Sequence, residues 1–204
     1  MNSLLKQTAA GLRVLIALTI LLGVLYPLGV WVVSRIPGLE PNAEGSVITE
    51  NGKAVGSDLI GIDPVAKDPA HDPWFHNRPS ETAADALGPA DPSISGASNK
   101  GAFDPDLVAT IKERKDLIAR REGVDPAQVP ADAVTASASG LDPDISPAYA
   151  DLQVARVSRV TGLAESEVHK MVDENTDGRG LGVLGEPGVD VLTLNLAVQA
   201  ASRR

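Results

Sequence analysis

The chain has 204 residues, no cysteine and a formal net charge of -9. Residues 1–35 contain three basic residues and no acid, so the other 15 basic and 27 acidic residues give the remainder a net charge of -12. A body this acidic repels nucleic-acid phosphates and anionic lipid, and the lack of cysteine excludes a disulfide scaffold and a thiolate metal site.

An uncharged run from Val14 to Ser34 predicts a transmembrane helix. At about 1.5 Å per residue, residues 14–33 match a hydrocarbon core about 30 Å thick. The run is longer than the core of a usual signal peptide, and no small-residue cleavage site follows it, so an uncleaved anchor is favoured over a cleaved signal. Pro27 near Gly23 and Gly29 predicts either a kink or the close approach of another helix, or reflects only the usual composition of membrane helices.

Basic residues set the expected orientation. Lys6 and Arg13 precede the run and only Arg35 follows it closely, which predicts a cytoplasmic N-terminus. We therefore expect a single-pass protein of the cell (inner) membrane with an extracytoplasmic C-terminal domain. Its expected parts are a cytoplasmic N-terminus (1–11), a transmembrane helix (12–35) and an extracytoplasmic α+β domain (36–204).

The expected domain begins with a β-hairpin over residues 47–55, because Asn51-Gly52 supplies the two positive-φ positions of a type I′ turn. A long ordered loop is expected over 62–105. Seven of the fifteen prolines follow an aspartate, and these carboxylates are expected to accept nearby backbone N–H groups rather than to be catalytic. The seven are Asp63, Asp68, Asp72, Asp91, Asp104, Asp125 and Asp142.

Three helices and a closing strand follow. An Asp-Pro start and a later glycine predict a helix from residue 104 to about 121, and Ser146-Pro147 starts a second helix that ends before Gly162. A third is expected over residues 165–175, with Val168 and Val172 facing inward. The apolar run 189–198 predicts a buried strand. Together these elements predict a single small α+β domain beyond the membrane helix.

Several apparent motifs lack the context that their chemistry requires. Gly180, Gly182 and Gly185 spell G-x-G-x-x-G but lie between a predicted helix and a predicted strand, the wrong order for a dinucleotide site. The chain has no phosphate-binding P-loop and no nucleophile elbow. Its three histidines lack zinc spacing, and His169 is expected on a solvated helix face. A triad of His76, Ser137 or Ser139, and Asp142 has no support from spacing. On these residues the chain is not an enzyme.

One weak metal signal remains open. Asp173, Asn175 and Asp177, followed by Gly178, match the opening of a calcium loop, but position twelve is Leu184 instead of glutamate.

Four segments of the outer domain resemble the C subunit of Kdp, the bacterial potassium-transporting P-type ATPase complex. We call them the shared segments: WFHNRPS (74–80), SGASNKG (95–101), VPADAVTASASGLDPDIS (129–146) and LGEPGVDVLTLNL (184–196). The apolar anchor and GSDLIG (56–61) fit as well, so the resemblance covers nearly the whole chain. The third segment is the most specific of the four.

The shared segments supply the candidate structural or partner-facing residues. They are Arg78, Pro79, Ser80, Ser95, Gly96, Ser98, Asn99, Thr135, Ser137, Ser139, Gly140, Leu141, Asp142, Pro143 and Asn195. The small residues of 134–143 predict a buried or partner-facing loop, because they permit close backbone approach.

The resemblance implies an accessory, non-catalytic subunit of a high-affinity potassium uptake complex. Its implied partners are a channel-like potassium-binding subunit, a P-type ATPase subunit and a small single-helix subunit. No cofactor is expected on this chain, since ATP, magnesium and potassium belong to the complex. The family is described as a catalytic chaperone that raises the ATP affinity of the pump subunit.

The sequence departs from the family pattern at four positions. Ile62 stands where the family usually has the glutamine implicated in nucleotide contact, so direct ATP contact is not expected here. Ala138, Asp144 and Asp190 stand where glycine, histidine and asparagine are usual. The alternative is a free-standing, membrane-anchored extracytoplasmic binding protein with a weak calcium site at residues 173–178.

Overall fold

A computed structural model describes residues 2–203. The chain divides into two units, Met1–Val47 and Ile48–Arg204, and each unit is described by itself.

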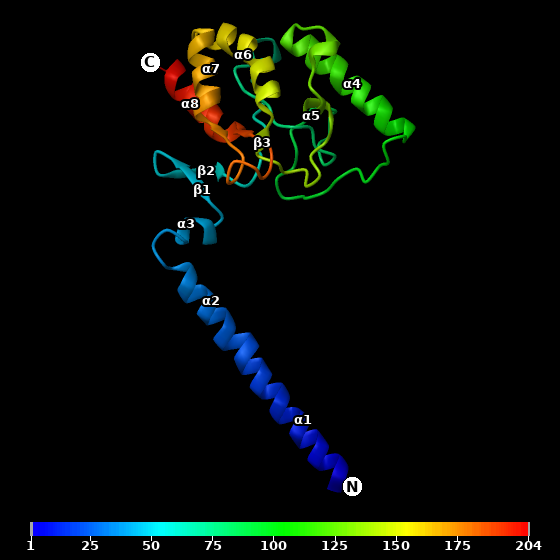
Figure 1. Ribbon diagram of the computed structural model, residues 1–204, viewed down its shortest axis with the longest axis vertical. Coiled ribbons are helices and arrows are strands. Elements are labelled where there is room, and N and C mark those ends of the chain that lie inside the picture. Colours follow the sequence, from blue (N-terminus) through cyan, green and yellow to red (C-terminus); the bar gives the residue numbers. More distant parts are fainter. Residues whose placement is uncertain (1, 204) are drawn as a thin grey trace. The chain divides into compact units, whose positions relative to one another are not determined.

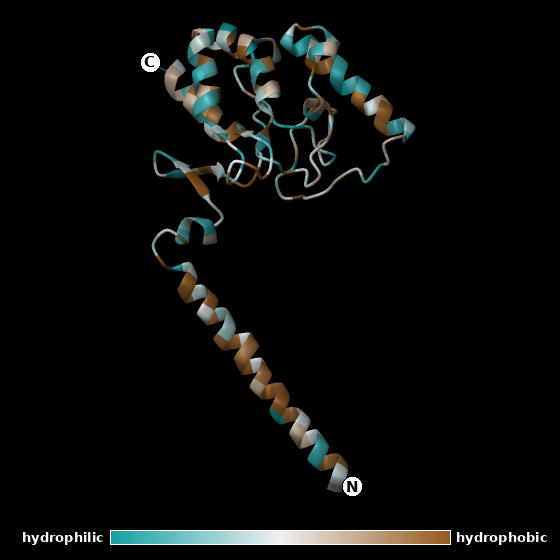
Figure 2. Cartoon of the chain, in the orientation of Figure 1, coloured by the Kyte–Doolittle hydropathy of each residue, from teal (hydrophilic) through white to brown (hydrophobic). Residues whose placement is uncertain are grey.

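The first unit is dominated by a long apolar helix. α1 (Asn2–Ile20), a π-helical turn (Leu21–Leu25) and α2 (Tyr26–Ser34) run as one continuous rod (Figure 1). Figure 2 shows it as mostly hydrophobic. Within the described residues, Ser3–Ser34 is the one helix long and apolar enough to cross a membrane, and an 18-residue stretch of it has a mean hydropathy of 2.3. The helix starts ten residues before the expected boundary at residue 12. The expected apolar helix is confirmed.

Pro27 causes the π-helical turn. Proline has no N–H, so the carbonyl of Gly23 lacks its α-helical donor, and the ring crowds that carbonyl. Just before the proline, the N–H of Tyr26 bonds to the oxygen of Leu21, which is five residues back instead of the four of an α-helix. One wider turn therefore absorbs the proline, and the chain remains helical on both sides of it.

The expected hairpin is present. After the short α3 (Glu40–Ala43), β1 (Val47–Glu50) pairs with β2 (Lys53–Ser57). Asn51 and Gly52 have φ of 51° and 76°, as a type I′ turn requires.

The three expected helices of the second unit are confirmed as α4 (Pro105–Glu122), α6 (Pro147–Thr161) and α7 (Glu165–Glu174). Asp104 and Ser146 cap the first two with their side chains, and Gly123 and Gly162 end them in left-handed conformations. The short elements are the 3-10 turns Pro69–His71 and Pro126–Gln128, and α5 (Ala131–Val134).

The prediction of a strand over 189–198 is wrong beyond its first two residues. β5 (Gly188–Asp190) ends at once, and α8 (Val191–Ser202) follows. The carboxylate of Asp190 accepts the N–H of Thr193 at 2.6 Å and starts the helix. Val191, Leu194 and Val198 then share a buried face at helical spacing. A short apolar run does not distinguish a buried strand from a buried helix.

A small antiparallel sheet joins the helices. β5 lies between β3 (Asp144–Ile145) and β4 (Thr176–Asp177). α6, α7 and α8 pack side by side, and α6 and α8 both contact β5 (Figure 1). The core includes Phe75, which comes from the long loop before α4, so this loop is a packed part of the domain. The mixed α/β fold expected for the domain is confirmed.

Candidate functional site

The third shared segment meets the first at an ion pair. Arg78 Nη1 lies 3.0 Å from Asp142 Oδ2. Nη2 of the same guanidinium donates to the carbonyl oxygens of Thr135 at 3.3 Å and Ala136 at 3.4 Å. The planar, multidentate guanidinium thus holds both ends of the 135–142 loop.

Serine hydroxyls hold the same loop from inside. Ser137 Oγ accepts the N–H groups of Gly140 at 2.9 Å and Asp142 at 3.3 Å. Ser139 Oγ donates to Asp142 Oδ1 at 3.1 Å and accepts the N–H of Leu141 at 3.0 Å. The run of small polar residues therefore satisfies its own backbone in the absence of regular structure.

Two other segments approach this loop backbone to backbone. The N–H of Gly96 and the hydroxyl of Ser95 both donate to the carbonyl of Ser139, at 2.8 and 2.9 Å. The N–H of Gly61 donates to the carbonyl of Leu141 at 2.8 Å. Ser137 reaches the first shared segment by donating its N–H to the carbonyl of Pro79 at 2.9 Å.

Gly140 lies at the closest point of this junction. Its φ is +76°, and a Cβ built there would lie 2.8 Å from the carbonyl oxygen of Gly96 and 2.9 Å from Ser80 Oγ. Glycine is needed here for both conformation and space. We call the assembly of residues 61, 78–80, 95–96 and 135–142 the loop junction.

The remaining candidate residues lie outside the loop junction. Asn99 donates to the carbonyl of Ala97 at 3.1 Å, and Ser98 Oγ accepts the N–H of Lys100 at 3.4 Å, so both stabilise a local turn. The carbonyl of Pro143 accepts the N–H of Val191 at the start of α8.

Two side-chain amides hold the first shared segment against the helices. Asn195 of α8 accepts the N–H of Phe75 at 2.8 Å and donates to its carbonyl at 2.9 Å. Gln153 of α6 does the same for His76, at 2.9 and 3.2 Å. Both side chains are buried. We call these two pairings the amide clamp.

A buried ionic network adjoins the clamp. Arg156 Nε lies 2.9 Å from Glu122 Oε2, and Nη1 donates to the carbonyls of Asp72 at 2.8 Å and Trp74 at 2.9 Å. The Glu122 side chain is fully buried and also accepts a bond from Arg121. Sequence analysis missed this network. Its signal was the spacing of Tyr149, Gln153 and Arg156 on the apolar face of α6, where polar side chains need buried partners.

His76 lies between two carboxylates. Its Nδ1 is 3.0 Å from Asp63 Oδ1 and its Nε2 is 2.6 Å from Asp72 Oδ2. Burial raises the pKa of Asp72, but the hydrogen bond and charge of His76, with the Trp74 N–H and Arg156, outweigh it and leave that pKa below its ordinary value. These three residues border a cavity of about 190 Å³. His76 bonds to Asp63 and Asp72, whereas Ser137, Ser139 and Asp142 bond within the loop junction, so the described residues do not assemble the triad considered above.

The Asp-Pro carboxylates mostly stabilise local turns. Within the described chain, five of the seven accept the N–H two residues onward, as expected: Asp68, Asp72, Asp91, Asp104 and Asp125. Asp63 instead accepts the distant N–H of Asn77 at 3.1 Å, and Asp142 pairs with Arg78.

Two acids face each other across the small sheet. Asp144 and Asp190 are register partners on β3 and β5. Burial, followed by the charges of Asp190 and other nearby acids, raises the pKa of Asp144. Burial likewise raises the pKa of Asp190, although its hydrogen bonds from Thr193 oppose the shift. Like charges directly opposite each other destabilise a sheet.

Among residues 2–203, no group of three or more His, Asp or Glu side chains is placed to hold a metal ion. The three residues of the calcium-like pattern lie on separate elements, with Asp173 in α7 and Asp177 in β4. Between them, Asn175 donates its amide to the carbonyl of Met171. His169 lies on an exposed face, as expected, 3.2 Å from Asp151.

Ile62 lies in an apolar groove of about 240 Å³, with Val55, Trp74, Leu192 and Leu196 among its lining residues. A Cβ built at Gly56 would lie 2.9 Å from its Cδ1, so the side chain packs closely against β2.

Comparison with known proteins gives a consistent result. The family model described as "K+-transporting ATPase, c chain" (KdpC) matches residues 8–200. A Kineococcus radiotolerans protein named "Potassium-transporting ATPase KdpC subunit" is 44% identical over 202 residues, covering 99% of this chain and 97% of that one. Proteins of the same name from Streptomyces avermitilis (44% identical; 98% and 97% covered) and Polaromonas naphthalenivorans (47% identical; 90% and 89% covered) are also similar.

Proposed function

The chain belongs to the KdpC family of K⁺-transporting ATPase subunits, and from that membership we propose that it is the non-catalytic accessory subunit of a high-affinity, ATP-driven potassium uptake complex. A component of such a complex has partner subunits. We propose that these are a channel-like potassium-binding subunit, a P-type ATPase subunit and a small single-helix subunit. Membership in the family favours this function over a free-standing binding protein.

The observation that carries the accessory role is the engagement of the shared segments with one another. Arg78, Ser137, Ser139 and Asp142 bond to each other and to loop backbone. Groups committed in this way stabilise a shape; they are not arranged as a nucleophile with its base. The sequence also has no D-K-T-G phosphorylation loop and no P-loop.

We propose that the subunit acts by assembly and positioning, with its outer domain extracytoplasmic and its N-terminus cytoplasmic. The apolar helix would fix the domain beside the channel-like subunit, and the domain would buttress that subunit or shape the ion entrance. The acidic body concentrates cations only within about 10 Å at physiological salt. ATP and magnesium would bind to the pump subunit. Ile62, packed in its apolar groove, supports a role without direct nucleotide contact.

The test is affinity purification of the tagged full-length chain in mild detergent, followed by assays of the recovered complex. We expect co-purification of the channel-like and pump subunits, and loss of potassium uptake when residues 36–204 are deleted. Labelling with γ-phosphate-labelled ATP should mark the pump subunit and leave this chain unmarked. A chain that purifies alone, or a phosphorylated form of this chain, would contradict the proposal.

A further inference from the structure

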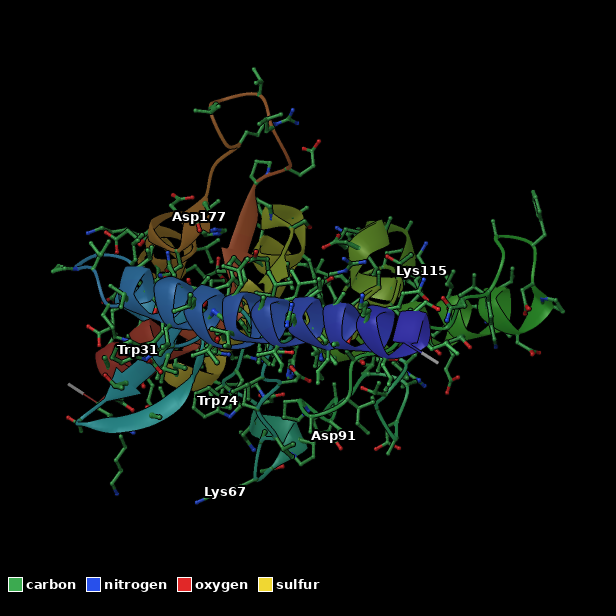
Figure 3. All side chains as sticks on the ribbon, turned by 90° about the horizontal axis from the view of Figure 1, so that it is seen from below. Trp31, Lys67, Trp74, Asp91, Lys115 and Asp177 are labelled. Atoms are coloured by element: carbon green, nitrogen blue, oxygen red, sulfur yellow. The ribbon has the colours of Figure 1, made fainter. Side chains whose placement is uncertain are left out.

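A small, mostly enclosed cavity lies where the first and third shared segments meet. It has a volume of about 10 Å³, which gives room for about one water-sized species and for nothing larger. In Figure 3 the labels Trp74 and Asp91 mark the two ends of the loop that supplies most of its lining residues. The lining residues with polar side chains are Asp63, Asn77, Arg78, Ser80 and Asp142.

The side chain of Asn77 is buried at this cavity. The residue is 8% exposed, and neither its Nδ2 nor its Oδ1 has a hydrogen-bonding partner among residues 2–203. Its backbone, by contrast, is held, because its N–H donates to Asp63 Oδ1 at 3.1 Å. Burying an amide without hydrogen bonds is costly, and buried amides in proteins are almost always paired with protein groups or with ordered water. An amide left in this way beside a cavity indicates a bound polar species.

The donors and charges around the cavity decide which species fits. Arg78 also has a buried Nε with no partner in the described part of the chain. The unpartnered N–H groups of Asn77 and Arg78 require an acceptor, which a metal cation cannot provide. An anion would be repelled by Asp63 and Asp142, which line the same cavity. Water is of the right size, and it can accept from an N–H group while donating to Asn77 Oδ1 and to a carboxylate.

We propose that this cavity binds one ordered water molecule, held by the side-chain amide of Asn77 and by the carboxylates that line the cavity. Asp63 lies 3.0 Å from His76 Nδ1, and Asp142 pairs with Arg78 at 3.0 Å. The water therefore links the carboxylates around His76 to the loop junction by hydrogen bonds. The site lies within the second unit alone, so the inference does not depend on the proposed function.

The direct test is nuclear magnetic resonance of the full-length, isotopically labelled chain in mild detergent. Magnetisation transferred from water should reach the side-chain amide hydrogens of Asn77, with the sign expected of a water molecule that stays bound longer than the protein takes to tumble. Gln153 is the control, because it is fully buried and its Nε2 already donates to the carbonyl of His76 at 3.2 Å. The absence of transfer to Asn77, or equal transfer to Gln153, would overturn the proposal.

Asn77→Leu gives a second test through the sign of its effect, since leucine is close to asparagine in size. If the amide were dry, the substitution would remove two unpaired buried polar atoms and would stabilise the protein. With water bound, it removes part of a satisfied network, and we expect the equilibrium constant for unfolding to rise about tenfold, or about 1.4 kcal/mol. Asn42→Leu, at an exposed position of α3, should leave that constant unchanged. An Asn77→Leu variant at least as stable as the wild type would refute the bound water.

Discussion

Asn195 and Phe75 are 120 positions apart in sequence, yet the amide of Asn195 pairs with both backbone groups of Phe75. The amide thus makes the two backbone hydrogen bonds that a neighbouring strand would make in a sheet. Gln153 repeats the arrangement at His76, so the segment is held between α6 and α8 by side chains. Since the following residues lead to Arg78, the amide clamp also sets the position from which the loop junction is built.

Asn195→Leu should destabilise the second unit by about 2–4 kcal/mol, because it leaves a buried N–H and a buried carbonyl of Phe75 without partners. Gln199→Leu, one turn further along α8 and outside the clamp, should change stability by no more than about 0.5 kcal/mol. Thermal and denaturant unfolding of the full-length chain in mild detergent would measure both. Equal stability of the two variants would contradict a structural role for the clamp.

Gly140→Ala should lower the free energy of unfolding more than Gly162→Ala does, although both positions have positive φ. A Cβ at Gly162 meets no atom of residues 2–203 within 4 Å, so that variant loses about 1 kcal/mol through backbone conformation alone. At Gly140 the contacts with Gly96 and Ser80 add about 1–3 kcal/mol of overpacking. The measurement is the difference in unfolding free energy between the variants, and a difference near zero would show that the loop junction yields easily.

Asp190→Asn should stabilise the domain at neutral pH by about 1 kcal/mol, because it removes the like charge opposite Asp144 while keeping a side chain that caps α8. The pKa of Asp190 is raised above 3.8 in the folded state. Its contribution to stability is therefore fully present below pH 3.8 and is lost as pH rises through the folded-state pKa.

The advantage of Asp190→Asn should accordingly grow from pH 3.8 upward and reach a plateau above the folded-state pKa of Asp190. Unfolding temperatures of both forms across this range provide the measurement. The exposed Glu113→Gln removes an equal charge from α4 and serves as the control. A variant whose advantage shrank with rising pH would show that the sign of the coupling is wrong.

A reporter fused to the C-terminus should be active only as an extracytoplasmic enzyme, because Lys6 and Arg13 precede the apolar run. Replacing both by glutamine should lower the correctly oriented fraction, since the charge difference across the helix then favours the opposite insertion. A C-terminal reporter active in the cytoplasm would reverse the proposed topology and would place the C-terminal domain in the compartment that contains ATP.

Elements whose signals lie within a few residues were predictable from the sequence. The hairpin turn at Asn51-Gly52, the caps of α4 and α6 and the apolar helix each depend on local geometry or composition, and each was found. α8 was missed because the same apolar run suits a strand or a helix. The capping carboxylate of Asp190, directly before that run, was the local signal that could have decided between them.

The long-range arrangement of the site was not predictable in the same way. The small residues of 134–143 predicted a buried or partner-facing loop. They did not identify its partners Arg78 and Gly96, which lie far away in sequence. Pairing of this kind follows from the packed fold and leaves no periodic pattern. Gln153, Arg156 and Glu122 were missed for the same reason, since each becomes informative only when its buried neighbours are known.

The π-helical turn before Pro27 has a consequence for how the membrane helix presents its surface. One additional residue in a helix rotates everything that follows by about 100° relative to an uninterrupted helix. Side chains of α1 and α2 that would otherwise line up along a single stripe therefore point in different directions. A neighbouring helix that follows one face of α1 meets a different face of α2, so the apolar helix can contact two separate neighbours along its length.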